Sequence, residues 1–368
     1  MSDSITDKVN KGVLSLSPYE PGLPLEQTKQ KLGLEKVIKL ASNENPLGPS
    51  PKALEVLSQI EMNRYPDGNA FYFKEEISKK YNVDINQITV GNGSNDLIEF
   101  VSRTFLNDQN SAIYSQHGFA IYPLAIKAAG ASAIKTPAKE WGHDLQAIIK
   151  LVEKNSKLIF IASPNNPTGT ANTLEEIKNF LEQLSRDVFV FLDQAYYEYI
   201  EDTKFDIPFS LVKDFPNLII SRSFSKAHGL AALRLGFCVS SAEVADYLNR
   251  VRQPFNANAF ALEAGRLAMN DIDHIKKSVD INVSGMKKIT KALDSLGFEY
   301  IKSNANFLSF NAKSDSDKAF DFFLKRGVIL RSLKVYEMPQ HLRVSIGTED
   351  EVDFFLKSLE IYAKQINS

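Results

Sequence analysis

Short runs of apolar residues recur through the first two thirds of the chain, and amphipathic segments such as residues 174–184 separate several of them. Within each run the apolar residues are nearly continuous, which is typical of strands that are covered on both faces. The runs lie at residues 88–90, 112–114, 158–161, 188–192, 218–220 and 237–239. This order predicts an α/β fold with a mostly parallel central sheet flanked by helices.

Beyond about residue 240 the pattern changes to longer helical segments, and an amphipathic run at residues 273–296 leads into a mixed α+β region. That region has strand patterns at residues 298–301, 307–310, 328–331 and 342–347 and helical patterns at residues 317–325 and 349–366. Three parts are therefore expected. They are an N-terminal arm with a small-domain segment at residues 1–40, a large α/β domain at residues 41–255 and a smaller C-terminal α+β domain at residues 256–368.

The composition is that of a globular protein with no sign of a polyanionic partner. The 368 residues are 43% hydrophobic and 24% charged, and the net charge of −2 favours neither nucleic acid nor an anionic membrane. Cys238 is the single cysteine, so an intramolecular disulfide is excluded. Residues 1–11 are polar and lack the core of a signal peptide, and no apolar run approaches the ~20 residues of a membrane span. We expect a cytoplasmic protein.

One lysine lies in an unusual context. Lys226 follows the apolar run at residues 218–220 in a turn of small residues, with Ser223 and Ser225 before it and Arg234 eight residues after it. Burial and a nearby cation such as Arg234 lower the pKa of a lysine, which then becomes usable as an amine near neutral pH. The two serines and Arg234 also form a plausible phosphate clamp. Considered alone, the same pattern fits a solvated lysine beside a Ser-rich loop.

A second polar segment follows an apolar run at residues 91–95. It is a Gly-rich loop between the strand pattern at residues 88–90 and a helical pattern, and it contains Ser94 and Asn95. Free backbone N–H groups and the helix dipole converge at such a junction, which makes it a natural phosphate seat. In a parallel sheet, ligands bind at the carboxyl ends of the strands, where both polar segments are expected to lie.

Two further motifs follow apolar runs, Ser-Pro-Asn-Asn-Pro-Thr-Gly at residues 163–169 and Asp-Gln-Ala-Tyr at residues 193–196. In order and spacing, these motifs and Lys226 resemble the fold type I aminotransferases, which carry pyridoxal 5'-phosphate (PLP). The resemblance implies that Lys226 binds the cofactor covalently and, once released, moves a proton during catalysis. It also implies that Asp193 holds the pyridine nitrogen and that Asn166 and Tyr196 hold the phenolic oxygen. The family usually has an acid at the position of Gln194, a change expected to leave the activity intact.

The same resemblance assigns the other cofactor contacts. Ser94, Asn95, Ser223, Ser225 and Arg234 match positions that hold the cofactor phosphate. Phe119 matches the ring that stacks on the cofactor, and Tyr65 matches a tyrosine that reaches across from the other subunit, which implies a homodimer with shared sites. Without the resemblance, Tyr65 and Phe119 would be read as packing residues. The mechanism requires no metal, and His117 and His228 are expected to have no role in it.

The C-terminal part contains two arginines that suit an anionic substrate. Arg343 matches the small-domain arginine of the family, and Arg331 lies twelve residues earlier on a neighbouring predicted strand. If the two guanidinium groups converge, they suit a phosphate monoester better than a single carboxylate. Otherwise Arg331 is a surface strand residue.

Together with the segments at residues 17–22, 41–46, 64–67 and 252–256, the two arginines resemble the histidinol-phosphate aminotransferase family over almost the whole chain. This resemblance implies transfer of an amino group between L-histidinol phosphate and 2-oxoglutarate in histidine biosynthesis, giving imidazole acetol phosphate and L-glutamate. Tyr19 and Asn45 are then expected in the substrate pocket. Two alternatives remain, an aromatic-amino-acid (phenylalanine or tyrosine) aminotransferase and a PLP-dependent threonine-phosphate decarboxylase.

Overall fold

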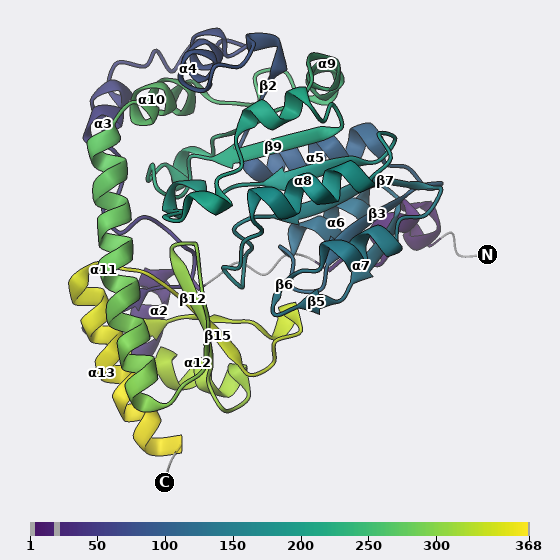
Figure 1. Ribbon diagram of the computed structural model, residues 1–368. Coiled ribbons are helices and arrows are strands. Elements are labelled where there is room, and N and C mark those ends of the chain that lie inside the picture. The colour runs from purple at the N-terminus through teal and green to yellow at the C-terminus, as the bar shows by residue number, and fades with distance from the viewer. Residues whose placement is uncertain (1–3, 18–22, 367–368) are drawn as a thin grey trace.

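The computed structural model describes residues 4–17 and 23–366, and its largest element is a seven-stranded sheet (Figure 1). The strands lie in the order β2-β10-β9-β8-β7-β3-β4. Their bounds are β2 Ile88–Gly91, β3 Ser111–Ser115, β4 Ser132–Thr136, β7 Ser156–Ala162, β8 Phe189–Asp193, β9 Leu218–Ser223 and β10 Gly236–Val239. All neighbouring pairs from β9 to β4 are parallel, and only β10 runs antiparallel to its neighbours β2 and β9. The predicted mostly parallel sheet is therefore confirmed.

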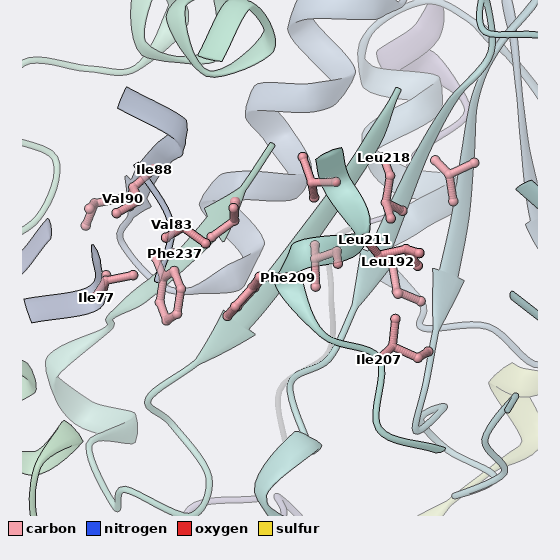
Figure 2. Packing of buried hydrophobic residues seen from close by; sticks show 14 of the residues in the cluster. Ile77, Val83, Ile88, Val90, Leu192, Ile207, Phe209, Leu211, Leu218 and Phe237 are labelled. Atoms are coloured by element: carbon pink, nitrogen blue, oxygen red, sulfur yellow. The ribbon is translucent and has the colours of Figure 1, made fainter. Parts of the chain in front are cut away.

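Side chains from each inner strand point alternately to the two faces of this sheet. Along β7, Ile159 and Ile161 belong to one buried cluster, whereas Leu158 and Phe160 belong to another on the opposite face. Figure 2 shows part of the first cluster, in which Leu192 and Phe237 from the strands pack beside residues of the covering loops and helices. Because both faces are covered, the strands read as continuous apolar runs in the sequence.

Helices accompany the large sheet, and four of those described begin with a side-chain cap. The helices of this part are α3 Pro51–Leu57, α4 Phe71–Tyr81, α5 Ser94–Phe105, α6 Ile121–Ala128, α7 Leu145–Lys150, α8 Leu174–Gln183, α9 Ala242–Val251 and α10 Ala259–Met269. A two-stranded hairpin of β5 (Ala138–Lys139) and β6 (Gly142–His143) follows β4. The four capped helices are α7, α8, α9 and α10. At α8, for example, Thr173 and Glu176 form a capping box that satisfies N–H groups at the start of the helix.

A second, antiparallel sheet forms the core of the C-terminal part. Its order is β11-β12-β15-β14, with β11 Tyr300–Ile301, β12 Phe307–Asn311, β14 Arg331–Ser332 and β15 His341–Ser345. The helices α11 Ile272–Leu296, α12 Ser316–Leu324 and α13 Glu349–Ile366 pack around it, and α11 and α13 lie side by side (Figure 1). Leu308, Phe310 and Phe355 belong to the buried cluster between these elements.

The strand predicted at residues 328–331 is two short strands in the structure. Val328–Ile329 (β13) pairs in parallel with Ile38–Lys39 (β1), a strand from the N-terminal segment. Only after Leu330 does the chain join the second sheet as β14. The chain thus changes its pairing partner in the middle of one apolar run, which a periodic pattern cannot reveal. The domain boundaries expected at residues 40 and 255 stay predictions.

The remaining elements are short, apart from helix α2. They are α1 Lys11–Leu14, α2 Leu25–Leu32 and seven 3-10 helices, η1 Ile5–Lys8, η2 Ile85–Gln87, η3 Tyr197–Tyr199, η4 Thr203–Phe205, η5 Phe209–Lys213, η6 Ala231–Leu233 and η7 Lys334–Tyr336. Within residues 4–17 and 23–366, no helix is both long enough and apolar enough to cross a bilayer.

Candidate active site

A cavity of about 300 Å³ lies at the carboxyl edge of the large sheet and is also walled by the small sheet. It brings together most of the residues predicted from the sequence. These are Ser94, Asn95, Phe119, Asn166, Asp193, Tyr196, Ser223, Ser225, Lys226, Arg234, Arg331 and Arg343. Asn43, Glu44, Tyr122 and Tyr336 line it as well and were not predicted.

Strand direction explains why these residues meet. Asp193 and Ser223 end parallel strands, and Ser94 follows the end of β2, so all three lie at the carboxyl edge. Arg234 precedes β10, the antiparallel strand, and the first residue of β10, Gly236, pairs with both Gly91 and Ser223. The amino end of an antiparallel strand lies at the carboxyl edge of its parallel neighbours. Arg234 therefore reaches the same edge.

One end of the cavity is a cluster of hydrogen-bond donors. Helix α5 begins at Ser94, and Gly93 before it provides no side-chain cap, so the first N–H groups of the helix are available to a ligand. Arg234 Nη1 lies 3.4 Å from Ser225 Oγ, and the Ser225 N–H donates to Ser223 Oγ at 3.1 Å. Gly93 has a φ of 85°, which favours glycine, and a Cβ there would displace Arg234, whose Nη2 would lie 2.5 Å away. The arrangement suits a phosphate group.

Lys226 lies half-buried between the donor cluster and the small-domain wall. Its Nζ donates to the Ser42 carbonyl at 3.3 Å and lies 5.5 Å from the centre of the Tyr196 ring. Burial, followed by the charge of Arg343, lowers the pKa of Lys226 to about 8. Arg234, the cation expected from the sequence, also lowers the pKa of Lys226, but it contributes less than Arg343. An amine with this pKa is partly neutral near physiological pH.

Asp193, at the end of β8, is buried and heavily hydrogen-bonded. Its Oδ2 accepts from the Tyr122 hydroxyl at 3.0 Å, and its Oδ1 accepts from the Ala195 N–H at 3.0 Å and from Ser221 Oγ at 3.4 Å. Burial raises the pKa of Asp193, and these hydrogen bonds, with the charge of Lys226, oppose that rise. Asp193 is thus a carboxylate in an apolar setting, fixed in orientation and suited to a cationic partner.

A chain of hydrogen bonds links the small-domain wall to Tyr196. Arg343 Nη1 donates to Asn166 Oδ1, and Asn166 Nδ2 lies 3.2 Å from the Tyr196 hydroxyl. Because a guanidinium group only donates, it fixes the orientation of the Asn166 amide. Asn43 Nδ2 also donates to the Tyr196 oxygen, at 2.9 Å. With two amides donating to its oxygen, Tyr196 can direct its own proton into the cavity, and burial raises the pKa of Tyr196 to about 12.

The two arginines of the small sheet face each other across a strand pair. Arg331 on β14 is the register partner of Arg343 on β15, and both line the cavity. Arg343 is buried, with 5% of its surface exposed, and its Nη2 donates to the Ala41 carbonyl at 2.6 Å. The two arginines therefore stand opposite each other on one strand pair that lines the cavity, as the proposed convergence requires.

Two predicted residues that the structure describes, Asn45 and Tyr65, do not line this cavity. Asn45 is buried behind it, where its Nδ2 donates to the Ala227 carbonyl and to Ser278 Oγ, both at 2.8 Å, so its expected place in the substrate pocket is corrected. Tyr65 is 83% exposed and stacks on Phe255 with ring centres 4.8 Å apart, outside the cavity of its own chain. Tyr19 lies outside the described residues.

The cavity residues that were not predicted have no distinctive pattern around them in the sequence. Asn43 stands two positions before Asn45 in the same polar turn, and its φ of 55° turns it toward Tyr196. In the sequence, Tyr122 looks like an ordinary packing residue of a helix. Across residues 4–17 and 23–366, no group of three or more His, Cys, Asp or Glu side chains could hold a metal.

Comparison with known proteins agrees with this geometry. Residues 35–359 match the family of class I and II aminotransferases. The chain is 45% identical to histidinol-phosphate aminotransferase 1 of Nitrosococcus oceani over 95% of each chain. It is 46% identical to histidinol-phosphate aminotransferase 2 of Haemophilus influenzae over 95% of this chain and 96% of that protein. A crystal structure of histidinol-phosphate aminotransferase from Sinorhizobium meliloti in complex with pyridoxal-5'-phosphate has the same fold, with a TM-score of 0.90 at 22% identity and 98% of each chain covered. The chain belongs to the class I and II aminotransferases and, among them, to the histidinol-phosphate aminotransferase family.

Proposed function

We propose that this protein is a PLP-dependent aminotransferase that transfers the amino group of L-histidinol phosphate to 2-oxoglutarate in histidine biosynthesis, giving imidazole acetol phosphate and L-glutamate. The observation that carries the substrate assignment is the pairing of Arg331 with Arg343 on the cavity wall. Two guanidinium groups bind a doubly charged phosphate monoester more favourably than one carboxylate does. The near-complete coverage by relatives of that name supports the same assignment.

The donor set of the cavity fits PLP. When bound, this cofactor acts as an electron sink for the substrate carbon. Asp193 would hold the pyridine nitrogen, because a buried carboxylate with fixed orientation pairs well with a protonated ring nitrogen. Phe119 would stack on the ring, and Asn166 and Tyr196 would donate to the phenolic oxygen. The phosphate would be held by Ser94, Asn95, Ser223, Ser225 and Arg234.

Lys226 provides the proton transfer. A pKa of about 8 leaves a substantial fraction of its amine neutral near pH 7.5, so Nζ can take a proton from the substrate carbon and later return it. Arg343 orients the anionic group of the substrate and also helps to lower the pKa of Lys226. The same arginine would bind a carboxylate of glutamate in the second half of the reaction. The two half-reactions therefore share one site.

We infer further that the active form is a homodimer. Around Tyr65, on the loop before α4, in the first turn of α4 and on the segment before α10, several large apolar side chains are more than 40% exposed. They are Met62, Tyr65, Phe71, Tyr72 and Phe255. Such a surface is typical of a subunit interface. There the partner's copy of Tyr65 would complete the phosphate site.

We propose a cytoplasmic location.

The dimer can be tested by mixing two inactive variants. A Lys226→Ala subunit and a Tyr65→Ala subunit, once unfolded and refolded together, should form hybrids with one intact site and regain about a quarter of the activity in an equal mixture. No recovery from the mixture, or a monomer in sedimentation, would contradict shared sites.

The function is tested by a single-turnover experiment. L-histidinol phosphate is added to the PLP-loaded enzyme without any oxo acid, and the absorption band of the bound cofactor is followed. Rapid conversion is expected, much faster than with phenylalanine or with histidinol lacking the phosphate, and Lys226→Ala should abolish it. Arg331→Gln should raise the half-saturating concentration of histidinol phosphate by about tenfold or more, the loss expected for a charged hydrogen bond. Equal conversion of phenylalanine would favour the aromatic aminotransferase, and release of CO2 would favour the decarboxylase.

A further inference from the structure

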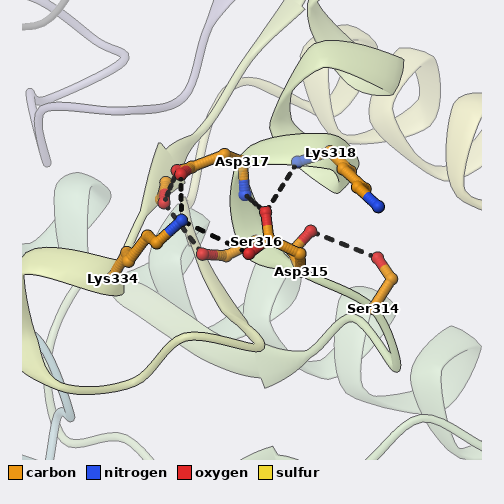
Figure 3. A network of polar contacts seen from close by, with 7 residues as sticks. Ser314, Asp315, Ser316, Asp317, Lys318 and Lys334 are labelled. Carbon is orange, nitrogen blue, oxygen red and sulfur yellow. Dashed lines mark hydrogen bonds and ion pairs between the residues drawn. The ribbon is translucent and has the colours of Figure 1, made fainter.

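The cavity wall contributed by the small domain includes one short segment, η7, that is fixed at both ends. At its start, Lys334 forms ion pairs with Asp315 at 3.4 Å and with Asp317 at 2.8 Å (Figure 3). Ser332 Oγ, just before it, donates to Asp317 at 2.7 Å. These contacts fix the start of η7 to the first turn of α12 and hence to the small domain.

The other end of η7 is held by the large domain. Glu337 Oε2 accepts from Gln116 Nε2 at 2.9 Å, and Glu337 Oε1 accepts from Lys135 Nζ. His117 Nδ1 lies 2.7 Å from the Tyr336 carbonyl, and since a carbonyl can only accept, this nitrogen carries the proton. Gln116 follows β3, and Lys135 lies on β4, the edge strand of the large sheet. The two domains are thus joined at the residues that follow the η7 turn.

The turn at residues 116–120 contacts the cavity and the small domain together. Phe119 lines the cavity. Ala120 packs against the buried cluster that includes Leu333 and Tyr336, and Tyr336 itself also lines the cavity. Any shift of η7 relative to this turn would therefore change the distance between Tyr336 and Phe119, that is, between the wall proposed to bind substrate and the wall proposed to bind the cofactor.

The backbone at Glu337 provides an independent sign that the position is constrained. Its φ is 60°, in the left-handed region, although the residue is not glycine. Such a conformation is unfavourable for an ordinary residue and persists only where the surroundings impose it. Here Glu337 is the C-cap of η7, where its N–H donates to the Lys334 carbonyl, and its side chain contacts Gln116 and Lys135.

We propose that Glu337 is a positioning residue, which holds Tyr336 and the arginine-bearing wall of the small domain at the right distance from the cofactor side of the cavity. Because Glu337 and Lys135 are both partly exposed, with 48% and 42% of their side chains accessible, their ion pair contributes only a modest free energy to this positioning. The identity of the substrate in this inference rests on the proposed function. The contact of Glu337 with Gln116 and Lys135 does not depend on it.

The kinetic test uses Glu337→Ala with a matched control. The pair Lys288–Asp353 has similar exposure, 39% and 43%, and joins α11 to α13 away from the cavity, so Asp353→Asn is that control. Glu337→Ala should raise KM for L-histidinol phosphate about threefold to tenfold, as expected for an exposed ion pair plus one hydrogen bond, while kcat changes less than twofold. Glu337→Gln, which keeps an acceptor for one of its two donors, should lie between the wild type and Glu337→Ala. The dissociation constant of PLP and the KM of Asp353→Asn should stay at wild-type values.

A second readout does not depend on catalysis. Trp141 is the only tryptophan of the chain, and its ring lies between His117 of the large domain, 5.3 Å away, and His341 of the small domain, 4.8 Å away. In the PLP-loaded enzyme, Glu337→Ala should increase acrylamide quenching of Trp141, and Asp353→Asn should not. The variant should also bind inorganic phosphate more weakly.

Two results would overturn the proposal. One is that Glu337→Ala has the same KM, the same phosphate affinity and the same Trp141 quenching as the wild type. The other is a loss of PLP affinity that parallels the rise in KM, since that would indicate a general loosening of the fold. If the wild-type enzyme does not convert histidinol phosphate at all, the proposed function fails, and the quenching and phosphate measurements still decide the role of Glu337.

Discussion

Replacing Tyr122 by phenylalanine isolates one hydrogen bond to the buried carboxylate. Tyr122 is completely buried, its ring stacks on Phe160 with centres 4.7 Å apart, and its hydroxyl donates to Asp193 at 3.0 Å. Phenylalanine keeps the ring packing and removes only the hydroxyl. Asp193 would keep the Ala195 N–H and the longer contact from Ser221. The expected change therefore comes from a single donor.

The size of the change should depend on pH. A hydrogen bond to an ionised group contributes roughly 1.5–3 kcal/mol, and one to a neutral group about 1 kcal/mol. Burial raises the pKa of Asp193 in the folded protein, so its ionised form costs stability above that pKa, and the cost disappears as the pH falls and the carboxyl is protonated. Tyr122→Phe should therefore lower the free energy of unfolding by ~1.5–3 kcal/mol at pH 8 and by about 1 kcal/mol once Asp193 is protonated.

Chemical denaturation of the cofactor-free protein at several pH values measures this difference. The control is the same substitution in an Asp193→Asn background, where no charge remains and the effect of Tyr122→Phe should be small and independent of pH. A loss that is the same at every pH in the Asp193 protein would refute the reasoning. So would an equal loss in the Asp193→Asn background, because the hydroxyl would then act through packing alone.

Three other substitutions test the surroundings of Lys226. In the cofactor-free protein, labelling of Lys226 by an amine-specific reagent should be half-maximal near pH 8, and Arg343→Gln should move this midpoint upward because it removes a repelling charge; a fixed or lower midpoint would contradict that account. Asn45→Ala should lower the free energy of unfolding by ~1–3 kcal/mol, since it removes buried hydrogen bonds to Ala227 and Ser278, and a loss under ~0.5 kcal/mol in urea would contradict that role. Gly229→Ala should prevent stable folding, judged by circular dichroism, because a Cβ there would lie 2.0 Å from the Gly48 carbonyl oxygen.

The sheet and most of the cavity were predictable because their signals are local. Each inner strand is a nearly continuous apolar run. Asp193 follows one run directly, and Ser223 and Lys226 follow another within a few residues, so the direction of the strands brings them to one edge. The edge strand β4 was missed because its five residues are mostly polar or partly exposed and carry no apolar run. The family resemblance added the roles of Asn166 and Tyr196, which no periodicity reveals.

The features of the site that could not be predicted depend on contacts between segments far apart in the sequence. Asn43 and Asn45 are equivalent in the sequence, and only the left-handed φ of Asn43 and the positions of Ser345 and Ala227 determine which one reaches Tyr196. The dominance of Arg343 over Arg234 in lowering the pKa of Lys226 likewise depends on how the two domains are placed. Neither fact can be read from residues adjacent in the chain.

The pairing of β1 with β13 has a consequence for synthesis of the protein. Ile38 pairs with Val328, so the small domain is built from segments almost 300 residues apart. At a translation rate of roughly 5–20 residues per second, β1 emerges from the ribosome about 15–60 s before its partner exists. The large sheet can form in that interval, whereas the small domain cannot be completed until the chain is nearly finished. Cotranslational folding should therefore be ordered, and ribosome-bound chains that stop before residue 328 should contain the large sheet beside an unpaired N-terminal strand.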